Sequence, residues 1–162
     1  EQVAIRLVPE AAVWDAEPIR SPERAVEVIG KYIRDMDREA VCVVNFNARL
    51  QPINFQIVSI GTLDRALCEP RELLKAGILS NASSMMILHN HPAGSIAPSG
   101  CDIQMTERME KVCELVGIPL MDSIIVGFGR EDYFSFRDAS MLVNPNQKVE
   151  RVAEERSGRG GR

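Results

Sequence analysis

The stretch SSMMILHNHPAGSIAPSGCDIQMT, residues 83–106, predicts a β-strand, a loop and the start of a helix, in that order. The apolar run that ends in LHNH is typical of a mostly buried strand. Two prolines and two glycines then interrupt regular structure, and DIQMTERMEKVCELVG shows helical spacing that ends at Gly117. The stretch therefore predicts one strand–loop–helix unit.

Both histidines of the chain lie in this unit, one residue apart. Side chains alternate sides along a strand, so His89 and His91 project from the same face and can contact one cation. Asp102 falls in the first turn of the predicted helix and supplies an anionic third ligand if the loop folds it back onto the pair. Three protein ligands leave a fourth tetrahedral position to water, as in catalytic zinc sites. The spacing therefore predicts a metal site.

Each part of this pattern also has a simpler interpretation. A His-x-His pair alone often marks no more than the end of a strand. Ser99 and Asp102 fit the S/T-x-x-D/E capping box, in which both side chains only satisfy backbone amides at a helix start. Both alternatives stay open here, although their coincidence in one short segment favours the metal.

The run His89, Asn90, His91, Pro92, followed by Ser99 and Asp102, resembles the JAMM motif H-x-H-x7-S-x2-D of the JAB1/MPN metalloprotease superfamily. Over about residues 21–138 the chain is similar to the bacterial RadC-like branch, notably in LHNHPAG, PSGCD, GIPLMDSIIVG and YFSFRD. The resemblance implies a single α/β domain of the JAB1/MPN, cytidine-deaminase-like kind, with a mixed β-sheet flanked by helices.

The resemblance also implies the site. One Zn²⁺ per chain is expected on His89, His91 and Asp102, with Ser99 helping to stabilise the tetrahedral intermediate. The family requires an upstream glutamate as general base, and the matching position is Glu39 in DREAVCVVNFN. Without the family, Glu39 is an ordinary solvated residue at the start of a strand.

The chain departs from the RadC-like pattern at one position. Where that branch usually reads DHIIVG, this chain has DSIIVG, with Ser123 in place of the histidine.

The expected function is a zinc-dependent hydrolase that cleaves a peptide or isopeptide amide bond with a metal-activated water. The alternative is a RadC-like interaction module with little or no catalysis, associated with DNA repair or mobile-element maintenance. A net charge of -4 and a pI near 5.3 disfavour a broad nucleic-acid-binding face and metal-assisted phosphodiester cleavage. No glycine-rich phosphate loop supports nucleotide binding, and the H-x-E with PCxxC signature of zinc deaminases is absent.

The 162 residues, 45% of them hydrophobic, fit one compact domain. We expect an N-terminal strand and connector over 1–20, the RadC-like domain over 21–140 and a disordered tail over 141–162, whose arginines are the local candidates for DNA contact. The elements expected after the N-terminal strand at Val3–Val8 are a helix over 22–35, a hairpin from AVCVVNF and PINFQIVSIG, a helix from Pro70 to about Leu79, and later strands over 123–126 and 133–136.

Four cysteines without a CxxC pair, and no secretory signal or membrane-length apolar run, favour a reducing cytoplasm without membrane association. The expected partner is a peptide or protein substrate that the sequence does not identify. The N-terminal strand could pair with a neighbouring molecule, and the oligomeric state stays open.

Overall fold

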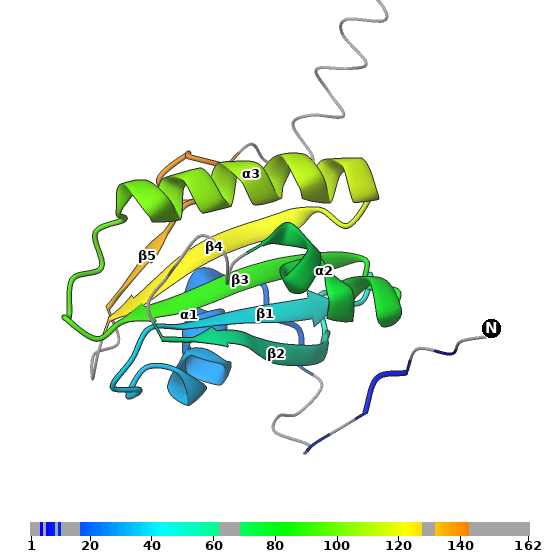
Figure 1. Cartoon of the computed structure of the whole chain (residues 1–162), viewed down its shortest axis with the longest axis horizontal. Coiled ribbons are helices and arrows are strands. Elements are labelled where there is room, and N and C mark those ends of the chain that lie inside the picture. The colour runs from blue at the N-terminus through cyan, green and yellow to red at the C-terminus, as the bar shows by residue number, and fades with distance from the viewer. Residues whose placement is uncertain are drawn as a thin grey trace, which may run out of the picture.

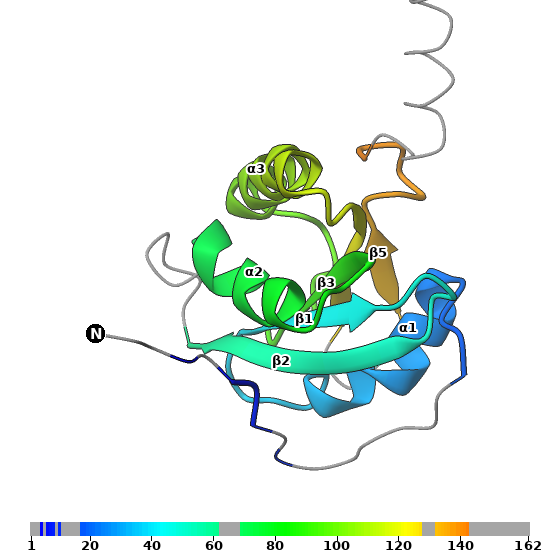
Figure 2. The same ribbon diagram turned by 90° about the vertical axis from the view of Figure 1, so that its right-hand side faces the viewer.

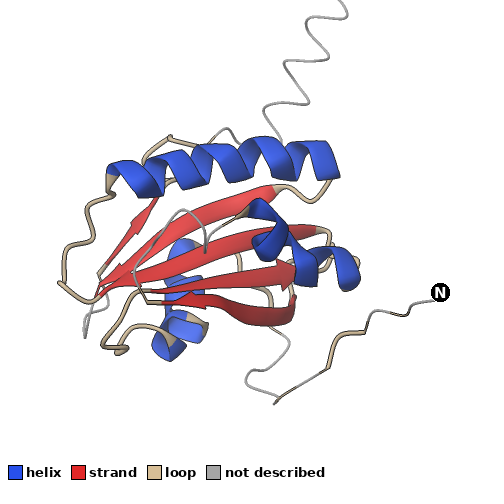
Figure 3. Cartoon of the chain, viewed as in Figure 1, coloured by secondary structure: helices blue, strands red, loops and turns tan. Residues whose placement is uncertain are grey.

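A computed structural model describes residues 4, 6–8, 10, 17–61, 69–127 and 132–142. Within them a five-stranded mixed sheet carries helices on both faces (Figures 1 and 3), which confirms the predicted fold class. The tail from 143 onward and part of the strand expected at Val3–Val8 lie outside the described residues. The elements are α1 (Pro22–Val28), the 3-10 helix η1 (Gly30–Tyr32), β1 (Ala40–Phe46), β2 (Pro52–Ile60), α2 (Pro70–Leu79), β3 (Ser84–His91), α3 (Gly100–Val116), β4 (Leu120–Gly127) and β5 (Tyr133–Ser135).

The strand order is β2-β1-β3-β4-β5. β1 pairs antiparallel with both β2 and β3, β4 pairs antiparallel with β5, and the one parallel pair is β3 with β4. Helix α3 makes the crossover between these two parallel strands (Figure 1). Because β1 and β3 run in opposite directions, the start of β1, the end of β3 and the start of α3 meet at the same end of the sheet.

The sheet lies between α1 on one face and α2 and α3 on the other (Figure 2), and an apolar core fills the space on each side. Val41 of β1 and Ile87 of β3 belong to the core beneath α2 and α3, whereas Cys42 and Leu88 belong to the core against α1. This alternation of odd and even positions is the period-2 pattern of a strand. It places both histidines of β3 on the face covered by α3.

The helix expected over 22–35 is wrong in its second half. The α-helix ends at Val28, and a short 3-10 turn follows at Gly30–Tyr32. Glycine weakens a helix interior, and here it also packs closely: a Cβ on Gly30 would lie 3.3 Å from Cγ1 of Val26. The backbone thus changes from an α-helix to a 3-10 turn where Gly30 packs against Val126 of β4.

The other elements follow their local sequence signals. The β1–β2 hairpin forms as predicted, and α2 spans Pro70–Leu79 as predicted. Helix α3 begins at Gly100, two residues before Asp102, and ends at Gly117 in a left-handed conformation with φ 79°. Strand β4 is longer than the predicted 123–126. No helix in the described part of the chain is both long and apolar enough to cross a membrane.

Candidate metal centre

The two histidines lie at the end of β3 on the face beneath α3. His89 is fully buried, and the side chain of His91 is 12% exposed. Their ring centroids are 5.0 Å apart with an interplanar angle of 60°. The pair thus presents one inner and one outer imidazole to the space at the N-terminus of α3.

Asp102 reaches this space because it lies in the first turn of α3. The helix starts with a capping box: Ser99 Oγ accepts the backbone N–H of Asp102 at 3.2 Å, and Asp102 Oδ2 accepts the backbone N–H of Ser99 at 2.7 Å. The capping box that the sequence suggested as the simpler interpretation therefore forms. It uses Oδ2 of the carboxylate, which also faces His91, and leaves Oδ1 directed at His89.

The three side chains converge closely enough to share one ion. His89 Nε2 lies 3.1 Å from Asp102 Oδ1, and His91 Nε2 lies 3.5 Å from Asp102 Oδ2. One possible ligand atom from each residue can be chosen so that all lie within 4.8 Å of one another. A tetrahedral zinc with bonds of about 2.0–2.1 Å places its ligands roughly 3.3–3.4 Å apart. The two histidine–aspartate separations are close to this value, although each involves a different oxygen of the Asp102 carboxylate. The group could hold a metal ion, and the capping box does not prevent it.

Unsatisfied buried atoms support a cation at this position. Nε2 of His89 and Oδ1 of Asp102 are buried and face each other at 3.1 Å, but neither makes a hydrogen bond of good geometry within the described chain. Leaving buried polar atoms unpaired costs stability. A divalent ion between them would satisfy both, and the nitrogen–nitrogen–oxygen donor set suits zinc.

Charge and hydrogen bonding prepare these residues as ligands. Burial alone would raise the pKa of Asp102, but the neighbouring imidazoles of His89 and His91 hold it well below its usual range. The same carboxylate raises the pKa of His91. His91 Nδ1 lies 2.8 Å from the carbonyl oxygen of Ser95, which can only accept, so Nδ1–H donates and the lone pair of the neutral ring is on Nε2.

Glu39 lies beside this group. In the β1–β3 ladder Val41 pairs with His89, so continuing the register by two residues sets Glu39 opposite His91 on the same face. Glu39 is half-buried, and its charge contributes to the raised pKa of His91. The structure thus brings Glu39, together with Ser99, to the three presumed ligands, while their catalytic roles stay predictions.

The sequence analysis missed the side chains that support the site. Asn90, between the two histidines, is fully buried and bonds to the backbone around Glu39. A polar residue within an otherwise apolar strand was the available signal. No such signal marked Ser95 in the sequence, because it contacts His91 through its backbone carbonyl, which every residue has. Ser123, where the branch usually has histidine, accepts a hydrogen bond from Thr106 Oγ1 at 3.0 Å and so ties β4 to α3.

Comparison with known proteins assigns the family. Residues 19–141 match the RadC-like JAB domain. The chain belongs to this family. Its relatives include UPF0758 proteins of Streptococcus sanguinis, 30% identical over 85% of this chain and 60% of the relative, and of Chlorobaculum parvum, 37% identical over 76% and 55%. A UPF0758 protein of Desulforamulus reducens is 37% identical over 78% of this chain and 57% of its own length. The chain therefore spans little more than half of these relatives.

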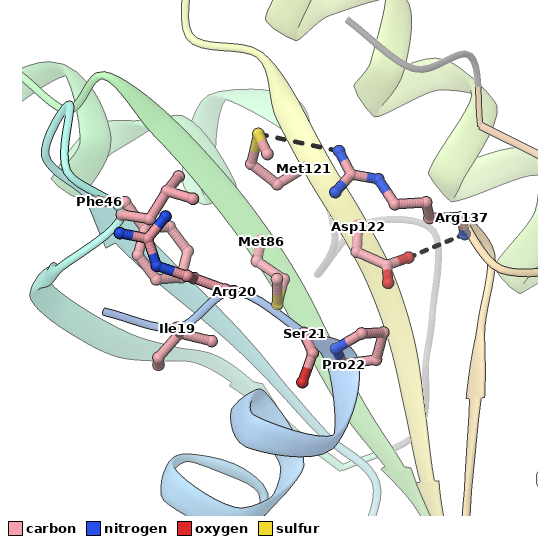
Figure 4. Close-up of a pocket in the computed structure, with 10 residues that line it drawn as sticks. Ile19, Arg20, Ser21, Pro22, Phe46, Met86, Met121, Asp122 and Arg137 are labelled. Atoms are coloured by element: carbon pink, nitrogen blue, oxygen red, sulfur yellow. Dashed lines mark hydrogen bonds between the residues drawn. The ribbon is translucent and has the colours of Figure 1, made fainter. Parts of the chain in front are cut away.

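This RadC-like JAB domain has a second buried carboxylate on the opposite face of the sheet. Asp122 accepts hydrogen bonds from Ser135 Oγ at 2.5 Å and the Ser123 N–H at 2.7 Å. It also accepts the Arg137 N–H at 3.0 Å (Figure 4). Burial raises its pKa despite these bonds. The adjoining cavity, about 40 Å³, has room for little more than water. Asp122 therefore joins β4, β5 and the turn after β5, and its role is structural.

Proposed function

We propose that this RadC-like JAB domain is a zinc-dependent hydrolase that cleaves a peptide or isopeptide amide bond. The observation that carries the proposal is the convergence of His89, His91 and Asp102, whose possible ligand atoms lie within 4.8 Å of one another and include buried atoms without a hydrogen bond. Bound zinc would supply a Lewis acid for the scissile carbonyl and a water that ionises near neutral pH. The partly exposed side of His91 gives a substrate access to that point.

Glu39 would act as the general base and acid. Glu39 directly precedes β1, where the continued register sets it opposite the outer histidine, and its charge acts on His91. From there it could take a proton from the attacking water and return it to the leaving amine. Because Glu39 lies on the same face of the sheet as the presumed ligands, it can be close enough to the attacking water for this proton transfer.

Ser99 would combine two tasks. Its Oγ accepts the backbone N–H of Asp102, which caps α3. A hydroxyl keeps a proton to donate while it accepts, so Ser99 can also donate to the oxygen that becomes negative during attack. Capping and stabilisation of that oxygen are compatible in one side chain.

The compartment and partners are proposed on narrower grounds. Cys42, Cys101 and Cys113 are free thiols, which supports a reducing cytoplasm. The substrate is proposed as a peptide or protein because amide hydrolysis fits the single-metal ligand set. Association with DNA stays a prediction from the family resemblance.

The test compares the wild type with Glu39→Gln, both loaded with zinc, on a proteome-derived peptide library and on isopeptide-linked peptides. Mass spectrometry of newly released amino termini and lysine side chains gives the rates. Loss of a general base should lower cleavage by about 100- to 10,000-fold, while zinc stoichiometry stays at the wild-type value. Glu72→Gln, which removes an exposed carboxylate paired with Lys75, is the matched control and should cleave normally. Equal cleavage by Glu39→Gln would contradict the base, and a zinc-loaded wild type that cleaves nothing would favour the interaction module.

A further inference from the structure

We propose that Asn90 is a positioning residue that holds Glu39 beside the metal-binding side chains. The inference rests on the proposed function, because it assigns a task to a residue that acts through the base. Asn90 lies between the two histidines in β3 but points to the opposite face of the sheet. One strand thus carries two presumed ligands on one face and this amide on the other.

Asn90 bonds to the backbone on both sides of Glu39. Its Oδ1 accepts the N–H of Ala40 at 2.6 Å, and its Nδ2 donates to the carbonyl oxygens of Arg38 at 3.0 Å and Met36 at 3.3 Å. The side chain is fully buried, where hydrogen bonds are strong and unpaired groups are costly. The backbone is therefore anchored directly before and directly after the glutamate.

The anchored segment has little other regular structure. Residues 36–39 lie between the turn after η1 and the start of β1, and they belong to neither a helix nor a strand. Arg38 is exposed. Besides Asn90, the end of β2 holds this segment, since the N–H of Gly61 donates to the carbonyl oxygen of Glu39 at 2.8 Å. Met36, at its start, bonds to the carbonyl oxygen of Ile33 at 3.2 Å and packs on the core. Removing the three bonds of Asn90 should therefore loosen mainly the backbone nearest Glu39.

The position of Glu39 matters more for chemistry than for folding. Displacing a catalytic group by about 1 Å can cost on the order of 100-fold in rate. Zinc binding should be insensitive to this displacement, because none of the three presumed ligands belongs to the segment. An effect on cleavage that leaves metal binding unchanged is therefore what positioning predicts.

The chemistry of the site favours an amide over its nearest replacements. Asn90→Asp keeps the size and the acceptor for Ala40, but an ionised carboxylate has no N–H to give two carbonyl oxygens. Asn90→Ser is too short to span all three partners. The two variants remove different parts of the same anchor, so the proposal stays testable if one of them folds poorly.

The matched control is Asn45→Ser. Asn45 is likewise fully buried in the sheet, but it lies toward the other end of β1 and donates to Oδ1 of Asn54 at 2.7 Å. Three quantities are measured for each variant: zinc affinity by competition with a chelator, amide hydrogen exchange at Gly61 by NMR, and cleavage of the best library peptide. The Gly61 amide reports on the Glu39 backbone without contacting Asn90 itself.

We expect zinc affinity within about 3-fold of the wild type for both Asn90 variants. Exchange at Gly61 should accelerate about 10-fold or more relative to Asn45→Ser, after correction for global stability from urea unfolding. Cleavage should fall toward the rate of Glu39→Gln, and combining Asn90→Ser with Glu39→Gln should lower it no further, because both act through one group.

Unchanged Gly61 exchange, zinc affinity that falls with global stability, or additive losses of cleavage in the double variant would each overturn the positioning role. If the wild type binds zinc and cleaves no peptide, the proposed function fails. Zinc affinity and exchange then still decide whether Asn90 holds the segment independently of the ligands.

Discussion

Replacing Asp102 with asparagine separates its two structural tasks. The amide oxygen of asparagine can still accept the N–H of Ser99, so one bond of the capping box is retained. The change removes the negative charge that faces His89 Nε2 at 3.1 Å and His91 Nε2 at 3.5 Å. The helix start should therefore survive while the presumed zinc site loses its anionic ligand.

The size of the effect follows from ligand linkage. Free zinc at 100 times the dissociation constant stabilises the folded chain by about 2.7 kcal/mol. For the roughly 120 residues that match the family, an unfolding entropy of about 2.1 cal/mol/K per residue converts this gain into a rise in Tm of about 10 °C. A 100-fold loss of affinity in Asp102→Asn leaves about 0.4 kcal/mol at the same zinc concentration, or less than about 2 °C.

The assay is thermal unfolding followed by circular dichroism, with and without buffered zinc, at one protein concentration. Asp138→Asn, which neutralises an exposed carboxylate, should keep the full rise. Elemental analysis should find near-stoichiometric zinc in the wild type and in this control. A rise of about 10 °C in Asp102→Asn as well would refute the ligand assignment.

Two further predictions concern the cap and the outer histidine. Urea unfolding should show that Ser99→Ala destabilises the chain by about 1 kcal/mol and Ser99→Gly by only a few tenths, because glycine is tolerated at an N-cap. Cleavage should fall in both variants if the Ser99 hydroxyl also donates a hydrogen bond to the substrate. Normal cleavage by Ser99→Gly would restrict Ser99 to capping. Asp102 raises the pKa of His91 above its ordinary 6.5, so in metal-free protein this pair stabilises the fold below that pH and the contribution is lost as pH rises through the raised value. The urea midpoint of metal-free wild type should therefore fall relative to His91→Gln as the pH rises above 6.5, and a parallel pH dependence in the two proteins would contradict the pairing.

Much of the fold was predictable because its signals are local. Strand β3 is an unbroken apolar run before the histidines, and α3 is bounded by a Ser99 cap and a Gly117 stop. Neighbouring residues decide such features, so they can be identified from a short segment. The convergence of Asp102 on the histidines also follows, since the loop between them is short and the helix must cover the face on which they lie.

What could not be predicted depends on contacts between distant segments. Helix α1 stops at Val28 and gives way to a 3-10 turn at Gly30, which packs against β4, although the apolar spacing continues beyond that point. The placement of Glu39 opposite His91 requires the register of β1 against β3. The sequence shows that Asn90 is a polar residue in an apolar strand, but it does not show its partners. They lie about fifty residues earlier in the chain, and only the folded sheet brings them together.

The double use of Asp102 has a consequence for the history of this architecture. The turn that starts α3 is closed by Ser99 and Asp102 whether or not an ion is present. Replacing the partly exposed His91 would therefore remove a presumed ligand while both bonds of the helix cap remain. If the proposed hydrolysis is correct, a single substitution could remove it and leave the capped helix available for a binding role.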